Sequence, residues 1–494
     1  MNEPLVGLAG GAMVWKAIQL ASVKVIFLAR TLILARLLVP EDFGLLAVSL
    51  IAVDFLVNIT NFGMIPALVQ RAEADERHYH AAWTVGLLRA VAIALVVILA
   101  APGIAALLAE PRAASLIRVV ALRPVLEAAA SAKVAEVTRH LRFRSIAFIS
   151  VPEAVVNTAV SIALARPLGV WALVAGTLAG SAISGLMSYR LAPYRPRLAF
   201  DSAAVRPLLQ FGRWIFLTSL ISVTGRALLQ IVITQKLGVG ELGLYYLAAK
   251  LALIPAEVSS EVVGAVAFPL YARLQADTQQ VIRAFRAIFT SVAALLFPAC
   301  ALLVVLAPSL VTTVLGPRWQ GTAPLIQLLA LVNIVGLFGD TVGPILKGVG
   351  RPGRLAIIEL IQSSLLIIGI WSLAGRYGVV SAALAWLAAV SASQLVSALF
   401  VQQVLPKPLA GLARPTLAIA AASGVGGLIA ALVAAAAPGP IGVIAASGLG
   451  LVTSVMLLWT FDRWFAFGLA NGFYRTFPQV AALVGYSQVN GQWR

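Results

Sequence analysis

The chain has 494 residues, of which 61% are apolar and only 11% are charged. An ordinary soluble protein has about 25% charged residues, so this composition excludes a soluble enzyme with one membrane anchor. It also excludes a disordered protein, and the single cysteine, Cys300, excludes an intrachain disulfide. The remaining class is an all-α polytopic membrane protein, because each membrane span needs roughly 20 mostly apolar residues.

Hydropathy predicts fourteen transmembrane helices, separated by short turns rich in Gly and Pro. The expected spans are 9–35, 43–64, 81–108, 113–131, 145–165, 170–189, 214–235, 243–272, 287–306, 322–346, 355–374, 378–402, 415–437 and 439–461. We expect four regions, namely an N-terminal lobe at 1–192, a C-terminal lobe at 193–403, two further spans at 404–461 and a tail at 462–494. The aromatic residues of the tail favour a cytoplasmic segment that lies in the membrane interface.

The net charge of +17 is distributed unevenly across the predicted loops. Of the 36 Lys and Arg residues, 22 fall in the two tails and the loops after even-numbered spans, and only six fall in loops after odd-numbered spans. Lys and Arg are enriched in cytoplasmic loops of membrane proteins. The bias therefore predicts an even number of spans with both termini in the cytoplasm. It also explains the basic charge without nucleic acid as a partner.

A short internal repeat connects the two predicted lobes. Glu41-Asp42-Phe43-Gly44-Leu45 resembles Gly240-Glu241-Leu242-Gly243-Leu244, and the offset of 199 residues equals six spans. Two copies of a six-span unit have the same orientation in the membrane. Transporters built from such parallel repeats place the substrate between the two copies, near the middle of the bilayer.

Ionisable residues inside the predicted spans carry the functional information, because each costs roughly 2.5–3.5 kcal/mol at the centre of an isolated span. The basic ones are Lys16, Lys24, Arg30, Arg89, Arg118, Arg123, Arg226 and Lys250, and the acidic ones are Asp54, Glu127, Glu153, Glu257, Glu261, Asp340 and Glu359. Such residues are expected to face protein or a wet cavity. Some alternatives stay open: Lys16, Arg30, Arg89 and Arg118 are close enough to span ends to reach the headgroups. Arg123 and Glu127 have the i, i+4 spacing of a self-neutralising pair.

Helical spacing groups these residues into two sets. We expect a cationic, polar cavity that binds substrate, formed by Lys16, Lys24, Arg30, Asp54, Asn58, Asn61, Arg89, Arg123, Arg226 and Lys250. Candidates for coupling transport to an ion gradient are Glu153, Glu257, Glu261 and Asp340. Within the eighth span, Lys250, Glu257 and Glu261 are spaced to form one narrow stripe if the helix is continuous.

Several segments resemble a known family. Leu37-Leu38-Val39-Pro40-Glu41-Asp42-Phe43-Gly44, Asn61-Phe62-Gly63-Met64-Ile65-Pro66, Phe268-Pro269-Leu270-Tyr271-Ala272-Arg273 and Leu315-Gly316-Pro317-Arg318-Trp319 resemble Wzx-type polysaccharide flippases. This family is a branch of the multidrug/oligosaccharidyl-lipid/polysaccharide exporter superfamily. The resemblance implies two parallel six-helix lobes in a V, two C-terminal helices and alternating access. It also implies an undecaprenyl-pyrophosphate oligosaccharide as substrate, moved to the periplasmic leaflet, with a polymerase and a chain-length regulator as partners in the pathway.

Two other functions compete with this interpretation. A multidrug antiporter of the same superfamily is expected to line its cavity with acidic and aromatic residues. A membrane-embedded enzyme of a polysaccharide pathway needs a catalytic motif, and the sequence contains no Asp-x-Asp, phosphate-loop or His-Glu-x-x-His motif. We therefore expect a transporter without cofactor or metal.

Overall fold

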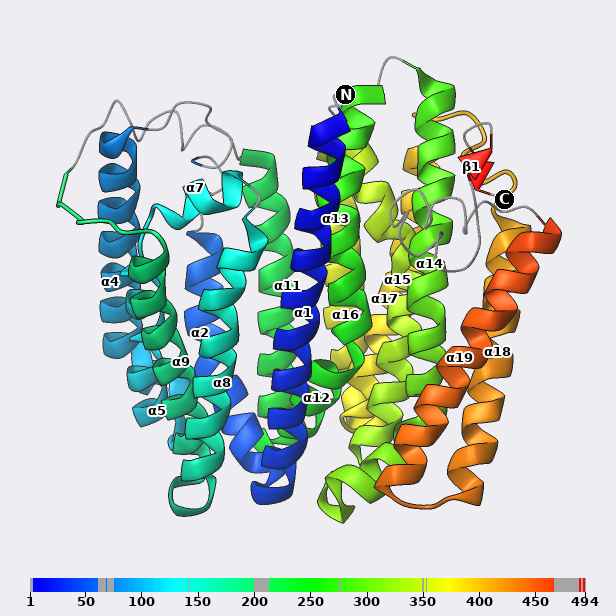
Figure 1. Ribbon diagram of the computed structural model, residues 1–494. Helices are drawn as coiled ribbons and strands as arrows, with labels where there is room; N and C mark the ends of the chain where they lie inside the picture. The colour runs from blue at the N-terminus through cyan, green and yellow to red at the C-terminus, as the bar shows by residue number, and fades with distance from the viewer. Residues whose placement is uncertain are drawn as a thin grey trace. The chain divides into compact units, whose positions relative to one another are not determined.

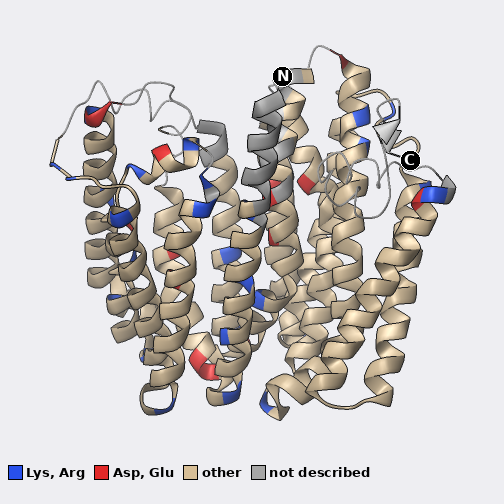
Figure 2. Ribbon diagram, in the orientation of Figure 1, with Lys and Arg blue, Asp and Glu red and all other residues tan. Residues whose placement is uncertain are grey.

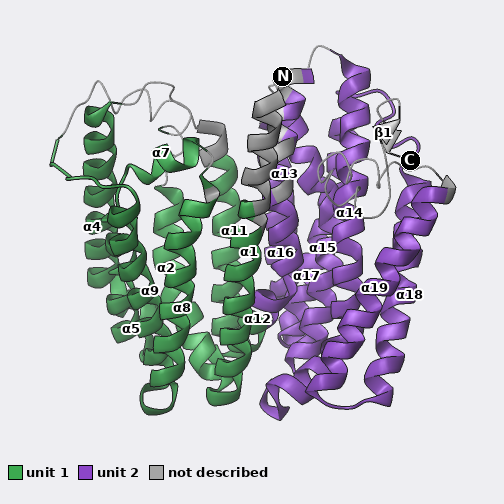
Figure 3. Cartoon of the chain, viewed as in Figure 1, with its two compact units in different colours: residues 1–247 green, residues 248–494 purple. Residues whose placement is uncertain are grey.

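A computed structural model gives the fold of the chain (Figure 1). It describes residues 3–60, 68, 75–140, 142–199, 213–274, 277–348, 351, 353–465, 488–489 and 492–493. Contacts divide the chain into two compact units, residues 1–247 and 248–494, which Figure 3 distinguishes by colour.

Unit 1 consists of α-helices. They are α1 (Glu3–Leu37), α2 (Pro40–Ile59), α4 (Glu76–Leu107), α5 (Ala113–Val120), α6 (Arg123–Ala128), α7 (Val134–Arg139), α8 (Phe143–Leu168), α9 (Val170–Leu191), α11 (Arg213–Leu237) and the first part of α12 (Val239–Ala252). Within the unit, α8 packs on α1 and α9, and α2 packs on α5 and α11.

Unit 2 contains the remaining helices and a two-stranded ladder near the C-terminus. Its elements are α13 (Ile254–Leu274), α14 (Thr278–Ser309), a π-helix (Leu310–Leu315), a 3-10 helix (Pro317–Trp319), α15 (Thr322–Gly348), α16 (Gly353–Tyr377), α17 (Val380–Gln402), α18 (Ala413–Ala436), α19 (Pro440–Phe465), β1 (Gln488–Val489) and β2 (Gln492–Trp493). Its core includes Phe285 and Phe289, against which the half-buried Phe338 packs, and the three ring centroids lie 6.2–6.4 Å apart. Most of the predicted interfacial tail lies outside the described residues.

The predicted class, an all-α polytopic membrane protein, is confirmed. Twelve helices in the described ranges are long and apolar enough to cross a membrane, and α12 with α13 forms one further span that is bent by 45°. The bend corrects the continuous helix expected at 243–272. Pro255 lies at the start of α13 and has no N–H to bond the carbonyl of Leu251, which breaks the helix at this point.

The expected fourth span at 113–131 is also interrupted. It forms α5 and α6, which have 8 and 6 residues and are separated by Ala121 and Leu122. Pro124 cannot donate a hydrogen bond to the carbonyl of Val120, which weakens the helix where the interruption occurs.

The direction of α8 indicates that α5 and α6 together still cross the membrane. The side chain of Gln19 donates to Ser150 Oγ over 3.0 Å, and Arg30 donates to Ser161 Oγ. Both links join residues 131 positions apart, so α1 and α8 run in the same direction. An odd number of crossings must then lie between them, and α2 and α4 supply only two. This favours the predicted count of fourteen spans, which remains a prediction.

The two copies of the internal repeat meet inside unit 1, where α2 and α12 begin. A Cβ added to Gly44 would overlap the carbonyl oxygen of Val239, and a Cβ added to Gly243 would overlap that of Pro40. Gly44 and Gly243 are related by the repeat offset, as are Pro40 and Val239. The two helix starts therefore cross symmetrically, with backbone against backbone.

Charged residues occupy few positions along the described helices. Figure 2 shows blue and red segments gathered towards helix ends, with fewer along the helix lengths, as expected for a membrane protein. The contact-based division at residue 247 differs from the predicted lobe boundary at 192, because α11 packs against α2. Compact units show where contacts are dense and not where a repeat ends, so the predicted lobes remain a prediction.

Candidate functional site

Three polar residues on α8, one per helical turn, face three small residues on α9. The facing pairs are Ser161 with Gly176, Asn157 with Gly180, and Glu153 with Ser184. We call these six residues the polar seam. Its close packing depends on glycine, since a Cβ on Gly176 would overlap Ser161 Oγ and one on Gly180 would come 3.0 Å from Asn157 Cβ. The Ser184 side chain forms a hydrogen bond with the Glu153 carboxyl group.

Arg30 on α1 reaches the end of this seam. Its Nε and Nη2 atoms donate to Ser161 Oγ over 3.2 and 3.1 Å. Among the described residues, no carboxylate pairs with Arg30, and Tyr246 on α12 interacts with it electrostatically. The guanidinium is half-buried within a predicted span, and the one hydrogen-bond acceptor that it has among the described residues is the neutral hydroxyl of Ser161.

Arg123 has the opposite environment, because two carboxylates neutralise it. Its Nε atom lies 2.7 Å from Glu127 Oε1 and its Nη1 atom lies 3.4 Å from Asp54 Oδ1. The spacing had already predicted the pair with Glu127, and the structure confirms it. Glu153 interacts electrostatically with both Arg123 and Glu127, so the seam ends near this cluster at its other end. Arg123, Asp54 and Glu127 together carry one excess negative charge when all are ionised.

Other predicted cavity residues of unit 1 have local partners. Arg89 Nη1 donates to the carbonyl oxygen of Thr60 over 2.9 Å, where it caps the C-terminus of α2. Asn58 Nδ2 donates to the backbone oxygen of Asp54 over 2.7 Å, and Arg226 Nη1 donates to Ser222 Oγ over 3.0 Å. These contacts give each side chain a structural role, and their contact with substrate remains a prediction.

The lysines of α1 and one asparagine complete the predicted set in unit 1. Lys16 and Lys24 are half-buried, and both have interactions within the structure. Asn61 lies outside the described residues.

In unit 2, the expected stripe on one straight helix is wrong. Lys250 lies on α12, whereas Glu257 and Glu261 lie on α13, beyond the 45° bend. A bend changes which side chains share a face, so the spacing argument does not hold across it. Asp340 on α15 interacts electrostatically with Glu359 on α16, so these two carboxylates form a pair in unit 2. The predicted role of these carboxylates in ion coupling remains a prediction.

The sequence reasoning missed Ser161, Asn157, Ser184 and Tyr246. Glu153, Asn157 and Ser161 are spaced i, i+4, i+8. Asp54 and Asn58 of the predicted cavity also have the i, i+4 spacing that places side chains on one helix face, so the seam could have been found by the same criterion. Tyr246 had no such signal, since its proximity to Arg30 and Arg123 depends on how α12 packs.

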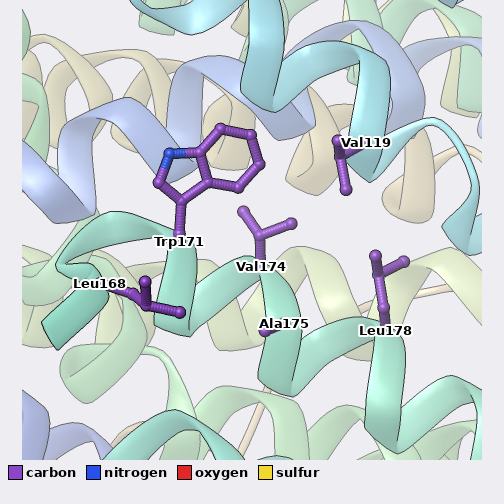
Figure 4. A pocket seen from close by; sticks show the side chains of 6 residues that line it. All are labelled: Val119, Leu168, Trp171, Val174, Ala175 and Leu178. Carbon is purple, nitrogen blue, oxygen red and sulfur yellow. The ribbon is translucent and has the colours of Figure 1, made fainter. Parts of the chain in front are cut away.

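An apolar pocket of about 450 Å³ lies at the start of α9. Its lining residues are Val119, Leu168, Trp171, Val174, Ala175 and Leu178. Figure 4 shows Trp171, Val174 and Leu178 along one helix, with Val119 opposite. Such a lining suits hydrocarbon and cannot hold an anion. Among the described residues, no group of three His, Cys, Asp or Glu side chains is arranged to hold a metal ion.

Comparisons with known proteins agree with this architecture. The chain is 28% identical to the lipopolysaccharide biosynthesis protein WzxC of Escherichia coli strain K12, over 68% of this chain and 69% of the relative. It is 29% identical to the succinoglycan biosynthesis transport protein ExoT of Rhizobium meliloti strain 1021, over 74% of each chain.

Solved structures share the fold at low sequence identity. The lipid II flippase MurJ in an inward closed conformation matches with a TM-score of 0.69 and 14% identity, over 92% of this chain and all of that one. An inward-facing multidrug resistance transporter of the MATE family matches with a TM-score of 0.54 and 17% identity, over 80% of this chain and 98% of that one. The family model for polysaccharide biosynthesis proteins matches residues 33–324, more than half of the chain. The chain therefore belongs to the polysaccharide biosynthesis protein family.

Proposed function

We propose that this multi-pass membrane protein is a flippase for lipid-linked oligosaccharides. It moves undecaprenyl-pyrophosphate-linked repeat units from the cytoplasmic to the periplasmic leaflet of a bacterial inner membrane, by alternating access. Both termini are then cytoplasmic, as the distribution of Lys and Arg favours. Support comes from the family, from relatives named for lipopolysaccharide and succinoglycan biosynthesis, and from the fold shared with a lipid II flippase.

The observation that carries the proposal is the uncompensated guanidinium of Arg30. Ser161 occupies the side edge of the guanidinium, formed by Nε and Nη2. The end-on edge, formed by Nη1 and the second N–H of Nη2, has no acceptor among the described residues. This edge matches a phosphate oxyanion in a bidentate arrangement. A pyrophosphate headgroup entering the membrane loses its hydration, and a fixed guanidinium replaces part of it.

We propose that carboxylates inside the predicted spans couple transport to an ion gradient, which supplies the energy. Glu153, next to the Arg123 cluster, and Glu257, Glu261 and Asp340 in unit 2 are the candidates. A carboxylate whose partner changes between two conformations binds protons or cations differently in each, so an ion gradient can bias the cycle. A polymerase and a chain-length regulator of the same pathway are the partners we propose for the complete export process.

Polymer export by cells that depend on this protein tests the proposal. Arg30→Ala is expected to abolish export and to make lipid-linked repeat units accumulate on the cytoplasmic side. Arg30→Lys keeps the charge but loses the bidentate edge, so it is expected to retain partial export. Normal export by the Arg30→Ala variant at normal abundance would refute the role of Arg30. Resistance to cationic drugs without polymer export would favour the multidrug antiporter instead.

A further inference from the structure

The hydrogen bonds of Ser161 are complete, and they fix how the hydroxyl is oriented. A serine hydroxyl has one proton to donate and two lone pairs to accept. Arg30 fills both acceptor positions, with Nε at 3.2 Å and Nη2 at 3.1 Å. The proton must then point elsewhere, and Asn157 Oδ1 lies 3.4 Å from Ser161 Oγ as its acceptor. Asn157 therefore turns the lone pairs of Ser161 towards Arg30.

Ser161 and Asn157 are more deeply buried than Arg30, which they hold in place. Ser161 is fully buried and Asn157 is 7% exposed, whereas Arg30 is half-buried. Gly176 makes this possible, because any Cβ on α9 at this point would occupy the position of Ser161 Oγ. The guanidinium of Arg30 is thus partly accessible, whereas the hydroxyl of Ser161 and the amide of Asn157 are buried.

The backbone of α1 is held in register by a second link. Gln19 and Ser150 connect α1 with α8 over 3.0 Å, eleven residues before the Arg30–Ser161 contact on both helices. Eleven residues correspond to roughly 16 Å of helix. Two polar links at this separation prevent α1 from sliding along α8, so the guanidinium is fixed both at its tip and through its backbone.

We infer that Ser161 is a positioning residue for Arg30, with Asn157 and Gly176 holding Ser161 in place. Ser161 does not contact the substrate. It directs the end-on edge of the guanidinium towards the oxyanion of the headgroup, which limits the rotamers that Arg30 adopts before binding. This inference rests on the proposed function, because it assigns the orientation of the residue that we propose to bind the headgroup.

Binding of inorganic pyrophosphate to the purified full-length protein tests the inference, with calorimetry as the measurement. Ser161→Ala is expected to weaken binding about tenfold, because charge-assisted hydrogen bonds that orient the guanidinium are lost. Gly176→Ala is expected to weaken binding as well, since its methyl group displaces the Ser161 hydroxyl. Thr158→Val is the matched control, because Thr158 lies on the same helix and its buried hydroxyl has no hydrogen-bond partner among the described residues.

A double-mutant cycle separates positioning from a general effect on the fold. In the Arg30→Ala background, Ser161→Ala is expected to cause no further loss of pyrophosphate binding. An additive loss, or unchanged binding in Ser161→Ala alone, would overturn the inference. If Ser161→Ala does not fold, Ser161→Cys fills a similar space with a weak acceptor and is expected to show the same loss.

The failure of the positioning role and that of the proposed function give different results. If Arg30→Ala stops polymer export while Ser161→Ala binds pyrophosphate normally, the function stands and the positioning role is wrong. If Arg30→Ala changes neither export nor pyrophosphate binding, Arg30 is not an anion-binding residue, and both proposals fail.

Discussion

The crossing of α2 and α12 allows a quantitative prediction about Gly44. A methyl group at this position would overlap the carbonyl oxygen of Val239 and lie 2.9 Å from the carbonyl carbon. A backbone carbonyl cannot rotate away as a flexible side chain does, so the two helix starts must separate. Overpacking of this kind costs about 1–3 kcal/mol. If the crossing opens and closes during transport, a cost of about 2 kcal/mol reduces the ratio of closed to open molecules roughly 30-fold.

Disulfide formation measures how often the crossing is closed. A Cβ at position 240 would lie 3.7 Å from Glu41 Cγ, so the pair Glu41→Cys and Gly240→Cys can approach the geometry of a disulfide. The only native cysteine, Cys300, is buried and is replaced by alanine in this background. Under a mild oxidant, the pair is expected to cross-link readily in the otherwise unchanged chain. Adding Gly44→Ala should slow the reaction severalfold or more.

Symmetry provides a second variant and a control for this experiment. Gly243→Ala should slow cross-linking to a similar degree, because its methyl group would overlap the carbonyl oxygen of Pro40. Gly86→Ala is the control, since a Cβ at Gly86 would meet no atom within 4 Å. Cross-linking that is equally fast with and without Gly44→Ala would show that the crossing tolerates a side chain, and the reasoning from backbone contact would then be wrong.

Further predictions concern orientation, acid stability, capping and coupling. Reporter fusions at Leu168 should read periplasmic and those at Thr278 cytoplasmic, and the reverse result would refute the predicted topology. Hydrogen bonds from the Gln280 backbone N–H and other donors lower the pKa of Asp277 below its ordinary value of 3.8. The resulting stabilisation of α14 is present above that value and is lost as the pH falls through the lowered pKa. Asp277→Asn should therefore reduce the acid-induced drop in melting temperature, and an unchanged pH profile would contradict this. Arg89→Ala should lower stability by about 1 kcal/mol through the lost cap of α2, and an unchanged thermal unfolding curve would argue against the cap. Glu257→Gln should retain pyrophosphate binding but lose gradient-stimulated transport in vesicles, and full gradient dependence would remove this carboxylate from the mechanism.

The sequence by itself determined the class of the protein and the placement of most helices. Long apolar segments must form helices in a bilayer, since every backbone N–H and C=O needs an internal partner there. The same local logic predicted the pair of Arg123 and Glu127, because residues four apart on a helix are neighbours whatever surrounds them. The sequence also located the repeat. Its glycines, Gly44 and Gly243, allow close backbone contact because they have no Cβ.

Only the tertiary structure decided which side chains of different helices contact one another. The sequence predicted Glu127 as a partner of Arg123, but only the structure adds Asp54 as a second partner and places Arg30 against a neutral hydroxyl of α8. Arg89 proved to cap α2, and the stripe of Lys250 and Glu257 is interrupted by a bend at Pro255. The partners of Arg30, Arg89 and Arg123 arise from contacts between segments far apart in the chain, whereas the bend is a local effect of Pro255. Helical periodicity determines which side chains share a face of one helix. Which other helix packs against that face depends on the tertiary structure, including close approaches at glycines, which have no Cβ.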